Sequence, residues 1–179
     1  MIRLFAALSL SSDVSDRLLG VQAGLTGWRL SPEENFHVTL AFFGEIDRPT
    51  AVDLEMALGQ VDGAAFEFWI DGVNVFGGPR PRLAYAAVRP EPALTLLRDK
   101  VRQAGRSAGL DLPSERYVPH VTLGRGGARA DQRLSRWLEA GAGLLAGPVP
   151  AESFALFRSD LGRNGPSYTE IARYALSAR

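Results

Sequence analysis

The chain of 179 residues contains no cysteine, only two histidines and a single lysine, Lys100. Without cysteine the protein cannot form disulfide bonds, thiolate nucleophiles, cysteine-ligated zinc sites or iron–sulfur clusters. No apolar stretch approaches the ~20 residues that span a bilayer. Residues 1–10 also lack the basic segment and the cleavage site of a signal peptide. We therefore expect a cytoplasmic protein without a membrane anchor.

The charged residues give the chain no net charge, because twenty basic residues balance twenty acidic ones. A binding site for a polyanion must therefore be local rather than a property of the whole surface. Hydrophobic residues make up 46% of the sequence, which is enough to form the core of one domain of this length. We expect a single domain over residues 1–179.

The pattern of apolar residues and turn formers predicts an α+β protein. An order of helix, strand, helix, strand, strand occurs twice after a first strand. The expected helices lie near residues 13–26, 49–58, 93–108 and 131–140, and the expected strands near residues 2–8, 36–43, 65–76, 82–88, 118–123, 152–157 and 168–176.

A direct repeat supports this division. The tetrapeptide His-Val-Thr-Leu occurs at residues 37–40 and again at residues 120–123, an offset of 120 − 37 = 83. The same offset superimposes the first expected helix on the third, and Tyr85 on Tyr168. We interpret the repeat as an internal duplication. It predicts two similar lobes, at approximately residues 10–89 and 90–179, with the N-terminal strand pairing in the sheet.

Both histidines of the chain lie in this repeated tetrapeptide. Residues i and i+2 of a strand face the same side, so His37 and Thr39 point together, and Val38 and Leu40 point into the core. A single strand histidine is usually a structural residue with a local hydrogen bond. Two in identical settings favour a functional interpretation, in which both His-Thr pairs converge on one cleft.

A site with two imidazoles suits phosphodiester chemistry. A neutral imidazole can accept a proton from an attacking oxygen while a protonated one donates to the departing oxygen, without a metal ion. Threonine hydroxyls can hold the non-bridging phosphate oxygens. A metal site that combines the histidines with Glu33, Glu34 or Glu45 is the alternative, but these carboxylates are expected in exposed turns.

These residues resemble the two-histidine (2H) phosphoesterase superfamily, whose signature is a pair of His-x-Thr/Ser motifs. The more specific resemblance is to the RNA 2′,3′-cyclic phosphodiesterases, long called bacterial 2′-5′ RNA ligases. Four ordered blocks carry it: Arg-Leu-Phe-Ala-Ala-Leu at residues 3–8, Pro-Glu-Glu-Asn-Phe-His-Val-Thr-Leu-Ala-Phe-Phe-Gly at 32–44, Pro-His-Val-Thr-Leu-Gly-Arg at 119–125 and Gly-Pro-Ser-Tyr-Thr at 165–169.

The resemblance implies a bilobal α+β fold in which two antiparallel sheets enclose a cleft and the helices lie outside. It also implies hydrolysis of terminal 2′,3′-cyclic phosphates of RNA to 2′-phosphates without a cofactor or metal, and weak, reversible 2′-5′ ligation. The expected partner is RNA with such ends or a cyclic mononucleotide. We expect a monomer with no obligate protein partner.

The family's roles map onto named residues of this chain. The resemblance assigns catalysis to His37 and His120, and phosphate binding to Thr39 and Thr122. Arg125 is similar to the basic residue that follows the family's second motif, and its fork could reach the phosphate. The offset of 83 places Phe42 opposite Arg125, so the two halves are not equivalent.

Other residues are candidates for contacts with the rest of the substrate. A base or sugar could stack on Phe43 or Tyr168, although core packing is the simpler interpretation of such aromatics. Four arginines at expected turns or strand ends are candidates for an RNA-binding rim or for ordinary surface positions: Arg80, Arg82, Arg158 and Arg163.

Two other functions stay open. One is a different 2H activity, such as hydrolysis of 2′-5′ oligonucleotides or of ADP-ribose cyclic phosphate. The other is an RNA-end binder without turnover. Paired histidines argue against a pure binder, because anion binding alone needs arginines more than titratable groups.

Overall fold

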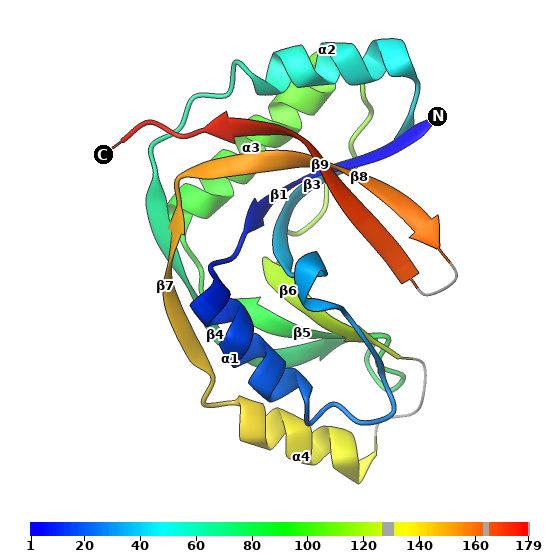
Figure 1. Ribbon diagram of the computed structural model, residues 1–179, viewed down its shortest axis with the longest axis vertical. Helices are drawn as coiled ribbons and strands as arrows, with labels where there is room; N and C mark the ends of the chain where they lie inside the picture. Colours follow the sequence, from blue (N-terminus) through cyan, green and yellow to red (C-terminus); the bar gives the residue numbers. More distant parts are fainter. Residues whose placement is uncertain (127–130, 163–164, 179) are drawn as a thin grey trace.

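Two antiparallel sheets form the centre of the protein, and four helices pack around them (Figure 1). The computed structural model describes residues 1–126, 131–162 and 165–178. Its elements are β1 (Ile2–Ser9), α1 (Ser12–Gln22), β2 (Arg29–Leu30), the 3₁₀ turn η1 (Glu33–Asn35), β3 (His37–Ile46), α2 (Arg48–Leu58), β4 (Phe66–Phe76), β5 (Leu83–Val88), α3 (Pro92–Ser107), β6 (His120–Arg125), α4 (Gln132–Gly141), β7 (Leu145–Ala151), β8 (Ser153–Gly162) and β9 (Gly165–Ala175).

The strand order shows that the two halves of the chain are interlocked. One sheet has the order β3-β1-β8-β9, and the other has the order β2-β6-β5-β4-β7. Each sheet therefore takes strands from both sides of residue 90, and β1 is a central strand between β3 and β8. The expected α+β class with two antiparallel sheets is confirmed. The expected division into lobes at residue 90 does not coincide with the division into sheets.

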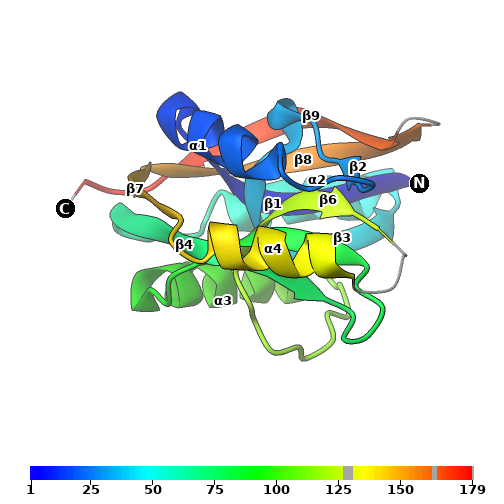
Figure 2. The same ribbon diagram turned by 90° about the horizontal axis from the view of Figure 1, so that it is seen from below.

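The helices also pack against elements from the other half of the chain. The pair α2 and α3 lies side by side at one end of the molecule, and α1 and α4 lie beside β7 and β4 at the other (Figures 1 and 2). In the described parts of the chain, no helix combines the length and the apolar character needed to cross a bilayer.

All four expected helices and all seven expected strands are present, but two strands were not expected. The strand β7 contains Pro148 and Pro150, which argue against a strand in the sequence. The structure places β7 at the edge of its sheet, where proline is tolerated because one side of the backbone needs no partner. The strand β2 has only two residues, too few for a pattern to reveal.

A β-bulge occurs in each copy of the repeated motif. In β3, Thr39 pairs with Ala7 and Ala41 pairs with Ala6, which leaves Leu40 as the extra residue. In β6, Thr122 pairs with Tyr85 and Gly124 pairs with Ala84, so the extra residue is Leu123, the repeat equivalent of Leu40. A bulge shifts the alternation of side chains by one position. Residues 42 and 125 therefore join the face of the histidines.

This shift decides between the two interpretations of Phe43, base stacking and core packing, in favour of the core. Plain alternation from His37 would place Phe43 on the cleft side, but the bulge turns it into the core, where its side chain is 6% exposed. There Phe43 packs against α3: a Cβ atom built on Gly105 would lie 2.9 Å from the Phe43 ring and from Leu112. Phe43 is a core residue, and Phe42 takes the exposed position instead.

We predict opposite effects of alanine at two helical glycines. In Gly105→Ala, overpacking against Phe43 and Leu112 costs about 1–3 kcal/mol, more than the ~1 kcal/mol of helix propensity that alanine contributes. In Gly20→Ala the propensity acts alone, because no atom lies within 4 Å of the added Cβ. Urea unfolding should show a less stable Gly105→Ala and a more stable Gly20→Ala. Equal stabilisation by both changes would contradict the packing described for Phe43.

Candidate active site

The two repeated motifs meet in one cavity of about 420 Å³. His37 and Thr39 reach it from β3, and His120 and Thr122 reach it from β6. The expected convergence of the two His-Thr pairs is therefore observed. The other residues around the cavity are Arg3, Phe5, Arg29, Leu30, Ser31, Pro32, Asn35, Phe42, Leu83, Arg125, Ser159, Leu161, Gly165, Pro166 and Tyr168.

Backbone carbonyls fix the orientation of both imidazoles in the same way. His37 Nδ1 lies 2.7 Å from the carbonyl oxygen of Asn35, and His120 Nδ1 lies 2.8 Å from that of Val118. A carbonyl only accepts hydrogen bonds, so each Nδ1 carries a proton and donates. Each Nε2 is then the nitrogen that can exchange a proton within the cavity.

The two Nε2 atoms differ in their surroundings. His37 Nε2 is 3.1 Å from Thr39 Oγ1, so the threonine hydroxyl donates to it when the imidazole is neutral. Within the described residues, His120 Nε2 has no hydrogen-bond partner. The Asn35 side chain, itself 8% exposed, donates to the carbonyl oxygen of Pro166 at 2.8 Å. This bond ties the support of His37 to β9.

Aromatic rings surround each imidazole and make its protonation unfavourable. The His37 ring centroid lies 4.9 Å from that of Phe5 and 5.3 Å from that of Tyr168. Burial lowers the pKa of His37 to about 4, and the nearby charges of His120 and Arg125 act in the same direction. The Asn35 carbonyl opposes them.

The rings of Phe76 and Tyr85 each lie 5.2 Å from that of His120. Burial lowers the pKa of His120 as well. Both imidazoles of the free site are thus mostly neutral at pH 7.

The cavity is basic although the whole chain is neutral. Arg3, Arg29 and Arg125 line it, and no aspartate or glutamate does so among the described residues. The Arg125 charge lowers the pKa of both histidines and acts against the rise in the pKa of Tyr168 that burial causes. The positive charge needed to bind an anion is therefore concentrated in this cavity, although the chain as a whole has no net charge.

Phe42 is an exposed ring on the wall of this cavity, with 47% of the residue accessible to solvent. The Arg3 guanidinium carbon lies 4.8 Å from the centre of the Phe42 ring. The offset of 83 between the two repeats had matched Phe42 with Arg125. This match was the signal in the sequence that Phe42 lies at the cavity. Tyr168 also lies in the cavity, as expected.

The remaining candidates lie elsewhere. Among the described residues, Arg80, Arg82 and Arg158 do not line this cavity, and Arg158 forms an ion pair with Asp160. Arg163 falls outside the described residues. Glu33 and Glu34, together with Glu170, border a neighbouring cavity that also reaches His37. Within the described ranges, no three histidine, aspartate or glutamate side chains cluster as a metal site would require.

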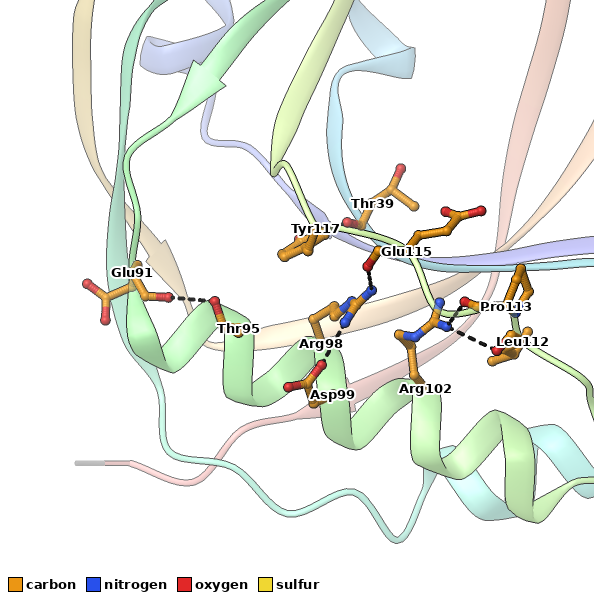
Figure 3. A network of polar contacts seen from close by, with 10 residues as sticks. All are labelled: Thr39, Glu91, Thr95, Arg98, Asp99, Arg102, Leu112, Pro113, Glu115 and Tyr117. Atoms are coloured by element: carbon orange, nitrogen blue, oxygen red, sulfur yellow. Dashed lines mark hydrogen bonds and ion pairs between the residues drawn. The ribbon is translucent and has the colours of Figure 1, made fainter.

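A tyrosine that the sequence analysis did not identify links the two motifs. The half-buried Tyr117, three residues before His120, donates its hydroxyl hydrogen to the carbonyl oxygen of Thr39 at 2.9 Å. Burial raises the pKa of Tyr117, so the hydroxyl keeps its proton. Figure 3 shows this contact above α3. The bond connects the segment before β6 directly to the backbone of β3.

Two arginines of α3 hold the segment that carries Tyr117 (Figure 3). The guanidinium carbon of Arg98 lies 5.0 Å from the centre of the Tyr117 ring, and Arg98 also donates to the carbonyl oxygen of Glu115 at 3.2 Å. Arg102 donates to the carbonyl oxygens of Leu112 and Pro113. This irregular segment has no periodicity, so no pattern in the sequence pointed to Tyr117.

Comparison with known proteins gives a consistent result. Residues 29–163 match the model of the 2′-5′ RNA ligase superfamily. An RNA 2′,3′-cyclic phosphodiesterase of Aeropyrum pernix is 34% identical, over 78% of this chain and 81% of the relative. One from Thermus thermophilus is 31% identical, over 98% and 90%. The crystal structure of Escherichia coli LigT complexed with 3′-AMP has the same fold, with a TM-score of 0.82, 23% identity and 98% of each chain covered.

We predict that the tether at Tyr117 stabilises the site. Tyr117→Phe removes the partly buried hydrogen bond to Thr39 and should lower the free energy of unfolding by about 1 kcal/mol. It should also shift the imidazole resonances of His37 in an NMR spectrum. The control is Tyr174→Phe, because the Tyr174 hydroxyl makes only a 3.4 Å contact to the Glu55 carbonyl, away from the cavity. An unchanged His37 spectrum in Tyr117→Phe would exclude the tether.

Proposed function

The chain belongs to the 2′-5′ RNA ligase superfamily, and from this we propose that it hydrolyses 2′,3′-cyclic phosphates at RNA ends to 2′-phosphates, with His37 and His120 as general acid and base. One observation carries the proposal. Two imidazoles, each with Nδ1 tied to a backbone carbonyl, line a single basic cavity with a threonine beside each. Curated relatives that carry the name RNA 2′,3′-cyclic phosphodiesterase support the choice of substrate.

The proposed reaction needs one proton on the histidine pair. The neutral imidazole accepts a proton from water through Nε2 as the water oxygen bonds to phosphorus. The bond between phosphorus and O3′ breaks, and the protonated imidazole donates its Nε2 proton to O3′. The product is a 2′-phosphate monoester with a free 3′-hydroxyl, and the pair again holds one proton. No metal ion is required in this scheme.

Three neighbouring groups suit the phosphate. Thr39 and Thr122 lie two residues after the histidines on the same face of their strands, where their hydroxyls can donate to the non-bridging oxygens. Arg125 reaches the same face because of the bulge at Leu123, and its guanidinium can bind the developing charge. We assign phosphate binding to these three side chains.

An exposed aromatic ring lies where it can stack against the base of the terminal nucleoside. Phe42 exposes its ring to the cavity beside Arg3, and base stacking on such a ring contributes about 1–3 kcal/mol. Tyr168 is held edge-on between His37 and Phe5, with part of its ring facing the cavity. We propose Phe42 for the base and Tyr168 for the sugar side.

We predict turnover without metal. Protein incubated with a nucleoside 2′,3′-cyclic phosphate and excess chelator should release the nucleoside 2′-phosphate, detected by chromatography. His37→Asn and His120→Asn should each reduce the rate by at least ~10². Arg136→Gln, which removes an exposed charge of α4, should match the wild type. The absence of product, or product only after metal addition, contradicts the proposed reaction.

We predict that kcat/KM is highest below pH 6.5. The free enzyme is active when one imidazole is protonated and the other neutral. The His37 pKa of about 4 and the lowered pKa of His120 place this state on the acid side of the usual histidine value. As the pH rises above the His120 pKa, the proton is lost and kcat/KM falls about tenfold per unit.

The bound phosphate changes this dependence. Its negative charge raises the pKa of both imidazoles, so the optimum of kcat should lie at higher pH than that of kcat/KM. A steady-state pH series with a cyclic mononucleotide measures both profiles. A kcat/KM that still rises between pH 7 and 8 would show that the free histidines are not shifted as described.

A further inference from the structure

Arg29 and Arg125 face each other directly across two paired strands. The short strand β2 adds to the edge of its sheet beside β6, with Arg29 opposite Arg125 and Leu30 opposite Gly124. Side chains directly opposite each other share a face, and both arginines line the cavity. Like charges in this arrangement repel, which is unfavourable unless an anion lies between or above them.

The protein holds β2 in this place with a buried side chain. Gln22, at the end of α1, is 5% exposed, and its amide nitrogen donates to the carbonyl oxygens of Ser31 and Leu123, both at 2.7 Å. The Ser31 amide also donates to Leu123 at 2.9 Å. Buried polar groups are costly unless they are paired, so these bonds fix β2 against the strand of His120. The position of Arg29 is therefore built into the core.

Neither arginine is neutralised by the protein. Among residues 1–126, 131–162 and 165–178, no ion pair or side-chain hydrogen bond involves Arg29 or Arg125. Together with Arg3, they give the cavity three positive charges. Protonation of one histidine adds a fourth positive charge. A cyclic phosphate diester carries one negative charge. The site has more positive charge than a cyclic mononucleotide can balance.

The two arginines lie at different distances from the histidines. Arg125 is on β6, the strand of His120, and its charge lowers the pKa values of both His37 and His120, whereas Arg29 is on the edge strand β2. Arg125 is also three residues past Thr122 along β6, and β2 lies on the outer side of that strand. Arg125 therefore serves the phosphate between the histidines, and Arg29 lies further out.

We propose that Arg29 binds the phosphodiester on the 5′ side of the terminal nucleotide, so that the protein selects RNA chains over cyclic mononucleotides. This inference rests on the proposed function. It assigns a second phosphate subsite to a residue outside both repeated motifs. The ligand is recognised by its charge and spacing, since an arginine fork binds phosphate oxygens without reading the base.

The experiment compares two substrates that differ by one phosphodiester. Adenosine 2′,3′-cyclic phosphate and the dinucleotide ApA with a terminal 2′,3′-cyclic phosphate are hydrolysed by the wild type, Arg29→Gln and the control Arg136→Gln. We expect kcat/KM of the wild type to be about tenfold higher for the dinucleotide, as a charge-assisted contact provides. Arg29→Gln should lower kcat/KM more for the dinucleotide than for the mononucleotide, and so remove this preference. Arg136→Gln should keep the preference.

Salt dependence gives a second measure. A contact between an arginine and a phosphate weakens as salt screens the charges. The affinity for the dinucleotide should therefore depend less steeply on salt in Arg29→Gln than in the wild type. An equal loss on both substrates, or no loss on the dinucleotide, overturns the inference and leaves the proposed function intact.

Product binding separates the two proposals. The dissociation constants of adenosine 2′-phosphate and of ApA carrying a terminal 2′-phosphate are measured by calorimetry. If the wild type hydrolyses neither substrate, the proposed function is wrong. Even then, a selective loss of dinucleotide binding in Arg29→Gln supports the second phosphate subsite, and unchanged binding rejects it.

Discussion

The bulged leucine in each copy of the repeated motif is the constraint on which the cavity depends. Leu40 and Leu123 each insert into a ladder whose partner strand runs on without a gap. The leucine and the residue after it both turn inward, so the fifth residue after each histidine faces the cavity. In β3 this residue is Phe42, and in β6 it is Arg125. One backbone irregularity, occurring twice, therefore gives the cavity an aromatic wall and a cationic one.

Both histidine rings are held rigidly, and their protonated form is unfavourable in the empty cavity. Backbone carbonyls orient both rings, but aromatic neighbours and nearby arginine make the imidazolium form costly in the empty cavity. An arriving anion reverses this balance, because its charge favours the protonated ring. Protonation and anion binding are thus linked, and the cavity is prepared for an anion before one is present. The same linkage accounts for the absence of carboxylates among its described lining residues, since a carboxylate would occupy the role of the ligand.

The convergence of the two His-Thr pairs could be predicted from the sequence, because two identical tetrapeptides left little freedom in their placement. His37, Thr39, His120 and Thr122 lie where a strand and a pseudo-symmetric arrangement would put them. The orientations of Phe42 and Phe43 could not be predicted, because a bulge depends on pairing with another strand and leaves no local pattern. Arg29 was missed for a related reason. Its two-residue strand is held in place by Gln22, seven residues earlier, which bonds to Leu123 on a distant strand.

The interlocking of the two halves has a consequence for synthesis on the ribosome. The sheet that contains His37 has the order β3-β1-β8-β9. The strand β1 therefore pairs with β8, which begins more than 140 residues later in the chain. The nascent chain leaves the ribosome from the N-terminus, so the edge of β1 in the β1–β3 pair stays open until β8 arrives. Such long-range pairing slows folding, because distant segments must meet before their contacts form. The first half of this duplicated protein therefore completes neither of its sheets alone, and the nascent β1–β3 pair is the segment that most needs protection from association with other chains.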